Sequence, residues 1–280
     1  MDEYKWWGRQ GQPPANFKTK KQLAELGLAP LKPVGIIKTF KYDVLLYDIN
    51  SPECCRPKRK PTEKQLETLA ANRKKAQIKR EYQAWQRSRE RIIEGDRVAA
   101  VLWARDELTK TDWTILDTET TGLYNAEIVE IAIVNHAGEP LLNTLVQPSI
   151  SIPLEVTAIH GITDEMVALA PTFPEVYPRI VEALEGKRVL IYNSSFDIKI
   201  LDYCRRLHGL PSFKLTKRSE CIMEWHARWA GDWSDYHEGY RYHPLCGGHR
   251  ALEDCLAALD RIKQIAADSD KIHCPVPRPE

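Results

Sequence analysis

The stretch Asp117-Thr-Glu-Thr-Thr-Gly-Leu123 follows an apolar run, Trp113-Thr-Ile-Leu116, and is the starting point for the second half of this chain. Residues i and i+2 of an extended strand point to the same face, so Asp117 and Glu119 project together from one strand end. Two neighbouring carboxylates favour a cation between them, and an all-oxygen site suits Mg²⁺ or Mn²⁺. A solvated strand end at a turn is the plainer alternative, and this motif alone does not decide between the two.

Two further acidic motifs lie downstream. Asp197 follows an apolar strand at 188–192 and a break at Asn193-Ser-Ser, which places it in the first turn of a helix, where the helix dipole favours an anion. Its plainer role is to stabilise that helix. The third motif, Gly247-Gly-His249-Arg-Ala-Leu-Glu-Asp254, places a histidine at a helix start with a carboxylate about one turn further on. A histidine there can remove a proton from water beside a metal, or it can simply cap the helix.

These motifs, taken in order, resemble those of the DEDDh exonucleases, which include the proofreading epsilon subunit of bacterial replicative polymerase, ribonuclease T and oligoribonuclease. The resemblance covers roughly residues 112–267, and Arg250 rather than a tyrosine precedes the last acid by four positions, as in the histidine variant of the family. The segments that carry the resemblance are Asp117-x-Glu119, Ile128-Val-Glu-Ile-Ala132, Ile159-His-Gly-Ile-Thr163, Asn193-x-x-x-Asp197 and His249-Arg-Ala-Leu-x-Asp254.

The resemblance implies an RNase H-like fold, with a mixed five-stranded sheet flanked by helices, and removal of nucleotides one at a time from a 3′ end. It implies two Mg²⁺ or Mn²⁺ ions. Asp117, Glu119 and Asp254 would hold one ion, and Asp117 with Asp197 would hold the other. His249 would act as the general base on the attacking water.

The resemblance also implies where a terminal nucleotide would bind. Gly122 has no side chain, so a nucleotide can approach its backbone, and an apolar residue beside it would meet the base. Core packing is the alternative for Leu123 and Phe196, and a structural turn is the alternative for His160. The predicted substrate-binding residues are Thr120, Thr121, Gly122, Leu123, Asn193, Phe196 and His160.

The chain departs from the family before its histidine. Only Cys246 to Gly248 separate the segment Tyr242-His-Pro-Leu245 from His249, where relatives place a longer loop or a helix. We therefore expect a short, rigid loop, and the sequence leaves the resting position of His249 open.

The composition of the chain bears on its cellular compartment and on contact with membranes. No apolar run in the 280 residues approaches the ~20 needed to span a bilayer, and the first residues show no signal-peptide pattern. The seven cysteines are scattered and include no Cys-x-x-Cys pair. Reduced thiols in a cytoplasmic protein without membrane contact fit these features.

The N-terminal half of the chain has a different pattern of predicted secondary structure. Thr19–Leu26 is predicted to form a capped helix, and the segments 35–40 and 43–47 a β-hairpin. A capping box at Thr62 should begin a long helix that reaches at least Ile93 and breaks at Gly95. The predicted parts of the chain are a flexible arm (1–16), an accessory N-terminal region with the basic helix (17–109), the exonuclease domain (110–270) and a flexible tail (271–280).

Strand-length apolar runs and helical stretches follow from residue 110. The predicted strands are 113–116, 128–134, 141–146 and 189–192. The predicted helices are 163–169, 174–184, 196–207, 221–229 and 251–267. This succession indicates a mixed α/β sheet.

The segment Arg56–Arg91 is strongly basic. It holds thirteen Lys/Arg against four acids, which gives a local charge of +9. Such a helix can bind a nucleic-acid backbone with little regard for sequence, or it can dock to a partner protein. The two interpretations are equally supported.

The predicted function is a metal-dependent 3′–5′ exonuclease that releases nucleoside monophosphates from DNA 3′ ends, with single-stranded ends favoured. An exoribonuclease that trims RNA is the alternative within the enzyme class, because sugar discrimination depends on contacts to the 2′-hydroxyl. The alternative outside that class is a nucleic-acid-binding adaptor with a vestigial nuclease fold.

Overall fold

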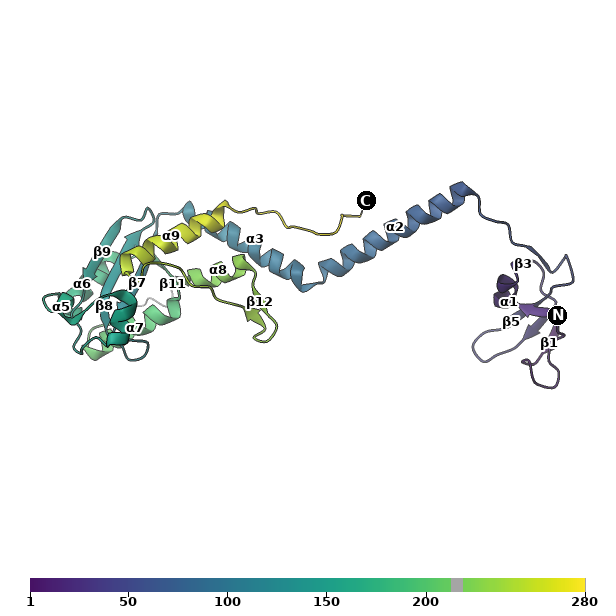
Figure 1. Cartoon of the computed structure of the whole chain (residues 1–280), viewed down its shortest axis with the longest axis horizontal. Coiled ribbons are helices and arrows are strands. Elements are labelled where there is room, and N and C mark those ends of the chain that lie inside the picture. The colour runs from purple at the N-terminus through teal and green to yellow at the C-terminus, as the bar shows by residue number, and fades with distance from the viewer. Residues whose placement is uncertain (213–218, 280) are drawn as a thin grey trace. The chain divides into compact units, whose positions relative to one another are not determined.

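The computed structural model describes residues 1–212 and 219–279, and the chain divides into two compact units, Met1–Gln77 and Ile78–Glu280 (Figure 1). Residues 213–218, within the predicted exonuclease domain, and Glu280, in the predicted tail, lie outside the described residues. The domain boundaries expected from the sequence stay predictions.

The second unit is built on a five-stranded mixed sheet, as predicted. β7, β8 and β9 form an antiparallel meander, and β10 lies parallel to both β7 and β11. The strand order is β11-β10-β7-β8-β9. The strands are β7 (Trp113–Thr120), β8 (Ile128–Asn135), β9 (Pro140–Leu145), β10 (Arg188–Ile191) and β11 (Ser219–Cys221). The sequence indicated the first four; β11 has only three residues, too few for a periodic signal, and Cys221 ends it rather than beginning a helix.

Six helices, α4 to α9, come after β9 in the described part of this unit. Those predicted from the sequence are α5 (Asp164–Val167), α6 (Phe173–Leu184), α7 (Ser194–Leu207), α8 (Ile222–Ala230) and α9 (Ala251–Ala267). The sequence did not indicate α4 (Leu154–His160), whose N-cap is Pro153 and whose cap makes no side-chain hydrogen bond. It also did not indicate the short hairpin β12 (Trp233–Ser234) and β13 (Gly239–Tyr240).

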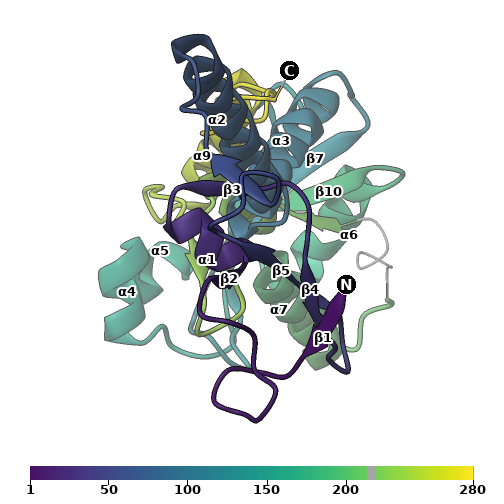
Figure 2. The same ribbon diagram turned by 90° about the vertical axis from the view of Figure 1, so that its right-hand side faces the viewer.

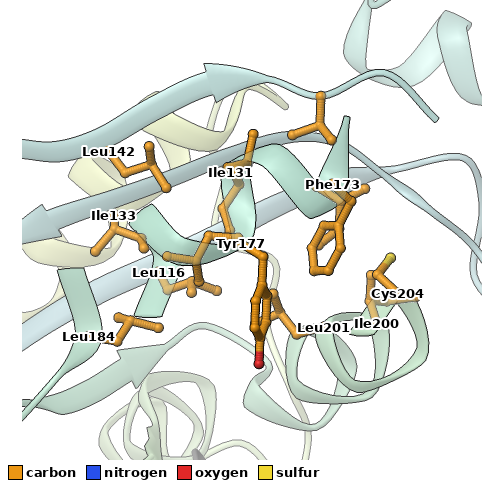
Figure 3. Close-up of a cluster of buried hydrophobic side chains, with 14 of the residues drawn as sticks. Leu116, Ile131, Ile133, Leu142, Phe173, Tyr177, Leu184, Ile200, Leu201 and Cys204 are labelled. Carbon is orange, nitrogen blue, oxygen red and sulfur yellow. The ribbon is translucent and has the colours of Figure 1, made fainter. Parts of the chain in front are cut away.

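The two faces of the sheet bury different helices. Leu116 packs with α6 and α7 in one core, which also contains Ile131, Tyr177 and Leu201 (Figure 3). Trp113 and Ile115 pack in the other core. Strand alternation therefore places residues 117 and 119 on the same face as Trp113 and Ile115, and residue 118 on the face of Leu116.

The second core includes a helix that comes before the sheet. α3 (Arg89–Leu108) lies beside α9 (Figure 1), and Ala100, Val101 and Ala104 are buried among α8, α9 and the sheet. α3 is therefore part of the packed body that carries β7.

The predicted helix break at Gly95 is wrong. α2 (Glu63–Gln86) ends nine residues earlier, and α3 begins at Arg89, with the Ser88 hydroxyl accepting a hydrogen bond from the Arg91 amide at 3.4 Å. A side-chain cap specifies a helix start, whereas a glycine in a packed helix costs only about 1 kcal/mol relative to alanine.

The first unit holds a small four-stranded sheet with the order β1-β4-β5-β2 (Figure 2). The predicted hairpin is confirmed as β4 (Gly35–Ile37) paired antiparallel with β5 (Val44–Asp48). β2 (Phe17–Thr19) pairs with β5, and β1 (Asp2–Tyr4), inside the arm expected to be flexible, pairs parallel with β4. A further ladder joins β3 (Leu28–Pro30) and β6 (Cys55–Pro57).

The N-cap predicted at Thr19 and the capping box predicted at Thr62 are both confirmed. Thr19 caps α1 (Lys20–Glu25) together with Gln22. At the start of α2 the Gln65 amide donates to the Thr62 hydroxyl at 3.3 Å, and the Thr62 amide donates to the Gln65 side chain at 3.0 Å. Across the described residues, no helix combines the length and the apolar character that crossing a membrane requires.

Candidate active site

Three carboxylates from distant parts of the second unit come together. Asp117 and Glu119 lie near the end of β7, and Asp254 lies in the first turn of α9, which covers the same face of the sheet. One oxygen from each residue lies within 4.8 Å of the others. The first and third motifs of the sequence therefore form one cluster.

Asp197 lies on the other side of β7. It occupies the first turn of α7 and is buried, and the Thr118 hydroxyl donates a hydrogen bond to its Oδ1 at 2.7 Å. Thr118 points to the face opposite Asp117 and Glu119, so β7 presents carboxylates on one face and a hydroxyl that holds a fourth acid on the other. The charge of Asp197 nevertheless reaches Asp117 and raises the pKa of that carboxyl.

Burial and mutual repulsion disfavour the charged form of these acids. Burial, followed by the charges of Asp197, Asp254 and Glu119, raises the pKa of Asp117 well above its ordinary range. Burial and then the Asp254 charge raise the pKa of Glu119 to about 7. Burial raises the pKa of Asp197 to about 7 against the opposing hydrogen bond from Thr118. Cations placed among these groups would restore their ionised form.

The donor set fits a hard divalent cation. Oδ1 of Asp254 is buried and has no hydrogen-bond partner among the residues that the structure describes. An orphaned carboxylate oxygen within reach of two further carboxylates is the oxygen-only environment that Mg²⁺ and Mn²⁺ prefer. The cluster of Asp117, Glu119 and Asp254 could therefore hold such an ion.

The glycines before His249 leave room for the acids of α9. A Cβ added to Gly247 would lie 1.6 Å from Oδ1 of Asp254, and one added to Gly248 would lie 2.0 Å from Oε2 of Glu253. Any side chain at Gly247 would displace the carboxylate that completes the cluster. These glycines are needed for the space that they leave.

The loop that carries His249 is anchored at its start. The Tyr192 hydroxyl donates to the His243 carbonyl oxygen at 2.7 Å, and its oxygen lies 2.7 Å from Nδ1 of the buried His226. His249 itself is exposed and has a φ of +52°, in the left-handed region that few non-glycine residues adopt. Burial raises the pKa of Asp254, and the neighbouring His249 partly opposes that effect, so the histidine lies beside the acidic cluster.

An ion pair between the buried Glu130 and the partly exposed Arg250, which the sequence did not predict, holds the start of α9. Arg250 donates from Nε to Oε2 of Glu130 at 3.0 Å and from Nη2 to Oε1 at 2.5 Å, and the Ala251 amide donates to Glu130 at 3.0 Å. Glu130 lies opposite Glu119 in the β7–β8 ladder. The available signal was an acid inside the otherwise apolar run of β8, because a buried acid requires a partner.

The four residues after the second acid differ in accessibility. The Thr120 hydroxyl donates to the Gly122 carbonyl at 2.6 Å, and the Thr121 hydroxyl accepts from the Glu127 amide at 3.0 Å. Both threonines are buried, whereas Leu123 is 72% exposed. Among the residues that the structure describes, no atom beyond Gly122 and its two chain neighbours lies within 4 Å of a Cβ built on Gly122. Space for a ligand is therefore found at Gly122 and Leu123.

The remaining predicted substrate contacts are less open. His160 is buried; its Nδ1 accepts from the Ile162 amide at 3.0 Å, and its Nε2 lies 3.3 Å from the Thr120 carbonyl oxygen. Phe196 packs against the core of α6 and α7. These contacts favour the structural interpretation of both residues. Asn193 caps α7 in the left-handed conformation, with a φ of +71° and no capping hydrogen bond from its side chain.

Known proteins resemble the second unit. Residues 114–261 match the model of the RNase_T family, described as Exonuclease. An uncharacterized exonuclease, CP81, from Escherichia phage 186 is 38% identical over 172 residues, which cover 55% of this chain and 88% of that protein. The DNA polymerase III subunit epsilon of Escherichia coli K12 is 32% identical over 100 residues, 32% of this chain; the chain spans only 41% of that protein's length.

One similar solved structure is described as Exonuclease X in complex with 5′ overhanging duplex DNA. Its sequence is 31% identical, and the match, with a TM-score of 0.38, covers 57% of this chain and 96% of that protein's chain. The family match extends over more than half of the chain and contains the four motif acids and His249. The family depends on divalent metal ions, in agreement with the acidic cluster. The chain belongs to the exonucleases of the RNase H-like superfamily, as a 3′–5′ exonuclease of the DEDDh type.

Proposed function

We propose that this enzyme removes nucleoside monophosphates from the 3′ ends of DNA, preferentially single-stranded ends, with two divalent cations. The observation that carries the proposal is the cluster of Asp117, Glu119 and Asp254, whose oxygens lie within 4.8 Å of one another. The names of several relatives, which are DNA polymerase subunits, favour DNA over RNA.

Each member of the five-residue set has a proposed role. Asp117, Glu119 and Asp254 would hold one Mg²⁺ or Mn²⁺, and Asp117 with Asp197 would hold a second. Such a pair of ions, when bound, would supply charge stabilisation for the attacking and leaving oxygens of a phosphodiester displacement. The exposed His249 beside Asp254 would accept the proton of the attacking water at its imidazole.

The open space at Gly122 and the exposed side chain of Leu123 support binding of a terminal nucleotide beside the acids. The backbone of Gly122 would face the sugar and Leu123 would contact the base. An exposed apolar side chain can contact any base, so this arrangement supports trimming without sequence preference.

The N-terminal region is proposed as an accessory module that holds nucleic acid. In α2 the side chains of Arg73, Lys74 and Lys75 are exposed in succession, which suits contact with phosphates rather than with base edges. Docking of this helix to a partner protein is the competing outcome.

The test is digestion of single-stranded DNA and RNA of the same sequence, labelled at either the 3′ or the 5′ end, with Mg²⁺, Mn²⁺ or EDTA. A 3′ label released at once as a mononucleotide, and a 5′-labelled ladder that shortens stepwise, would support 3′–5′ removal. Faster digestion of RNA would replace the DNA proposal by the exoribonuclease alternative. No digestion with any metal would leave the vestigial-nuclease alternative.

His249→Gln tests the proposed base. We expect hydrolysis to fall about 10²–10⁴-fold, as for the loss of other positioned general bases. His237→Gln, which removes an exposed histidine of the β12–β13 hairpin, is the control and should hydrolyse DNA at the wild-type rate.

A further inference from the structure

Two loops and the start of a helix meet at one end of the small sheet in the first unit. β1 and β4 run parallel with Tyr4 opposite Ile37, so both strands finish at this end of the sheet. β5 starts there, because Val44 pairs with Ile37, and β2 ends nearby with Thr19 opposite Leu46. The loop after β1 (residues 5–12), the hairpin turn (38–43) and the start of α1 therefore meet.

These segments line an open hollow of about 610 Å³. Its walls include two tryptophans and a tyrosine, of which Trp6 is 44% and Tyr42 70% exposed. Phe40, in the same hairpin turn, is fully exposed. Exposed aromatic rings around a hollow are costly to leave in water, and a flat aromatic ligand such as a nucleobase can stack on them.

The same segments are positively charged. They contain six basic residues, Lys5, Arg9, Lys20, Lys21, Lys38 and Lys41. Lys38 pairs with Glu3 at 3.2 Å, and within the described parts of the chain the other five form no salt bridge. The hollow itself is lined by two of these bases, Lys20 and Lys21, and by two acids, Glu25 and Asp43, so the excess of cations lies in the segments around it. The excess of unpaired cations favours a polyanion.

The loop after β1 is held in shape by its own hydrogen bonds. The Lys5 amide donates to the Gly11 carbonyl at 2.9 Å, and the Gly8 amide donates to the Gln12 side chain at 2.6 Å. A tied loop loses little conformational entropy when a ligand binds to the ring that it carries. Trp6 is therefore presented on a preorganised support.

We propose that this hollow binds single-stranded nucleic acid, with bases stacked on Trp6 and Tyr42 and phosphates held by Lys20 and Lys21. Stacking needs unpaired bases, so the surface selects single strands over duplexes. The inference rests on the proposed function in one respect, because it assigns to this hollow the substrate class of the second unit. Binding itself requires neither the acidic cluster nor a metal.

The experiment measures binding by the full chain in EDTA, by fluorescence anisotropy of a labelled dT oligonucleotide of about 20 nucleotides, longer than sites of about 4–16. We expect Trp6→Ala and Tyr42→Ala each to weaken binding at least about fivefold, and the pair Lys20→Ala and Lys21→Ala to lessen its salt dependence. Trp6→Phe keeps a ring and should bind within about twofold of wild type.

Leu31→Ala and Lys32→Ala are the matched controls, since both side chains are exposed on the same unit but do not line the hollow. They should bind the oligonucleotide as wild type does. None of the ring variants should change binding of a blunt duplex.

The proposal is overturned if Tyr42→Ala binds dT like wild type, because this exposed side chain can be removed without disturbing the fold; an anionic protein partner would then be the better occupant. Failure of the proposed nuclease activity can be distinguished from failure of the proposed binding by the hollow. Hydrolysis of a hexanucleotide with Mn²⁺ should be equal for wild type and Tyr42→Ala, and its absence in both would leave the binding result intact.

Discussion

The two units of this chain carry opposite charge. Residues 1–77 hold sixteen Lys/Arg against eight Asp/Glu, a net charge of +8, whereas residues 78–280 hold twenty-four against thirty-one, a net charge of −7. The acids of the second unit include the partly buried cluster of Asp117, Glu119 and Asp254, whose negative charge disfavours phosphate unless cations neutralise it. An acidic metal site and a surface that holds phosphates need opposite charges, and in this chain the two signs of charge fall on different units.

The largest effect should come from an acid of the cluster. Asp254→Asn is expected to slow hydrolysis of single-stranded DNA at least about 10³-fold, because loss of metal-centred charge stabilisation removes several kcal/mol. Affinity for a long oligonucleotide in EDTA should stay within about twofold of wild type. Asp260→Asn, on the exposed side of the same helix, is the control in both assays. Loss of binding by Asp254→Asn would contradict the proposal that the first unit binds the oligonucleotide independently of the acidic cluster.

The next effect tests the space beside Asp254. Gly247→Ala should reduce hydrolysis by about 10–100-fold, because an ångström-scale displacement of a catalytic group costs up to about 10²-fold. Gly239→Ala, whose added Cβ would meet its nearest atom at an ordinary 3.7 Å, should hydrolyse DNA normally. Equal rates for the two variants would show that the loop can shift without disturbing the acids.

A smaller effect is expected on the salt dependence of DNA binding by the basic helix α2. Replacing Arg73, Lys74 and Lys75 by alanine should reduce the slope of log affinity against log salt by about 2 for single-stranded DNA, since each lost phosphate contact contributes about 0.7. The rate of hydrolysis of a hexanucleotide should not change. Lys263→Ala, an exposed lysine of the second unit, should leave the slope as it is. An unchanged slope in the triple variant would favour the partner-protein interpretation of α2.

The smallest effect concerns stability without metal. Because burial raises the pKa of Asp197 to about 7, the folded protein retains a proton that the unfolded chain loses at about pH 4, and stability falls as pH rises between these values. In EDTA at pH 8, Asp197→Asn should therefore melt about 2–4 °C above wild type for each kcal/mol of relieved charge. The difference should vanish near pH 4 and reverse when Mn²⁺ is added.

Asp202→Asn is the matched control on α7, because Arg205 lowers the pKa of that exposed carboxyl. It should not raise the melting temperature at pH 8. A lower melting temperature for Asp197→Asn in EDTA would show that its carboxylate stabilises the fold even without cations.

Much of the second unit could be predicted because its signals are local. The alternation of Trp113, Ile115, Asp117 and Glu119 assigned one face of β7, and capping residues located helix starts. The short β11 and the uncapped α4 carry too little periodicity, and the helix break near Ser88 was hidden by the stronger glycine signal at Gly95. The ion pair of Glu130 and Arg250 joins residues 120 positions apart, so no local sequence pattern predicts it.

The order of residues was enough to identify the carboxylates and the histidine, and to predict that Asp117 and Glu119 share a face, because strand parity is a property of the chain itself. Folding alone could show that α9 brings Asp254 to that face, that Thr118 holds Asp197 from the opposite one, and that Gly247 leaves the space that Asp254 occupies. The same is true of the aromatic hollow, where two loops and the start of α1 meet at one end of the small sheet. These are relations between distant segments, and only packing sets the distance between them.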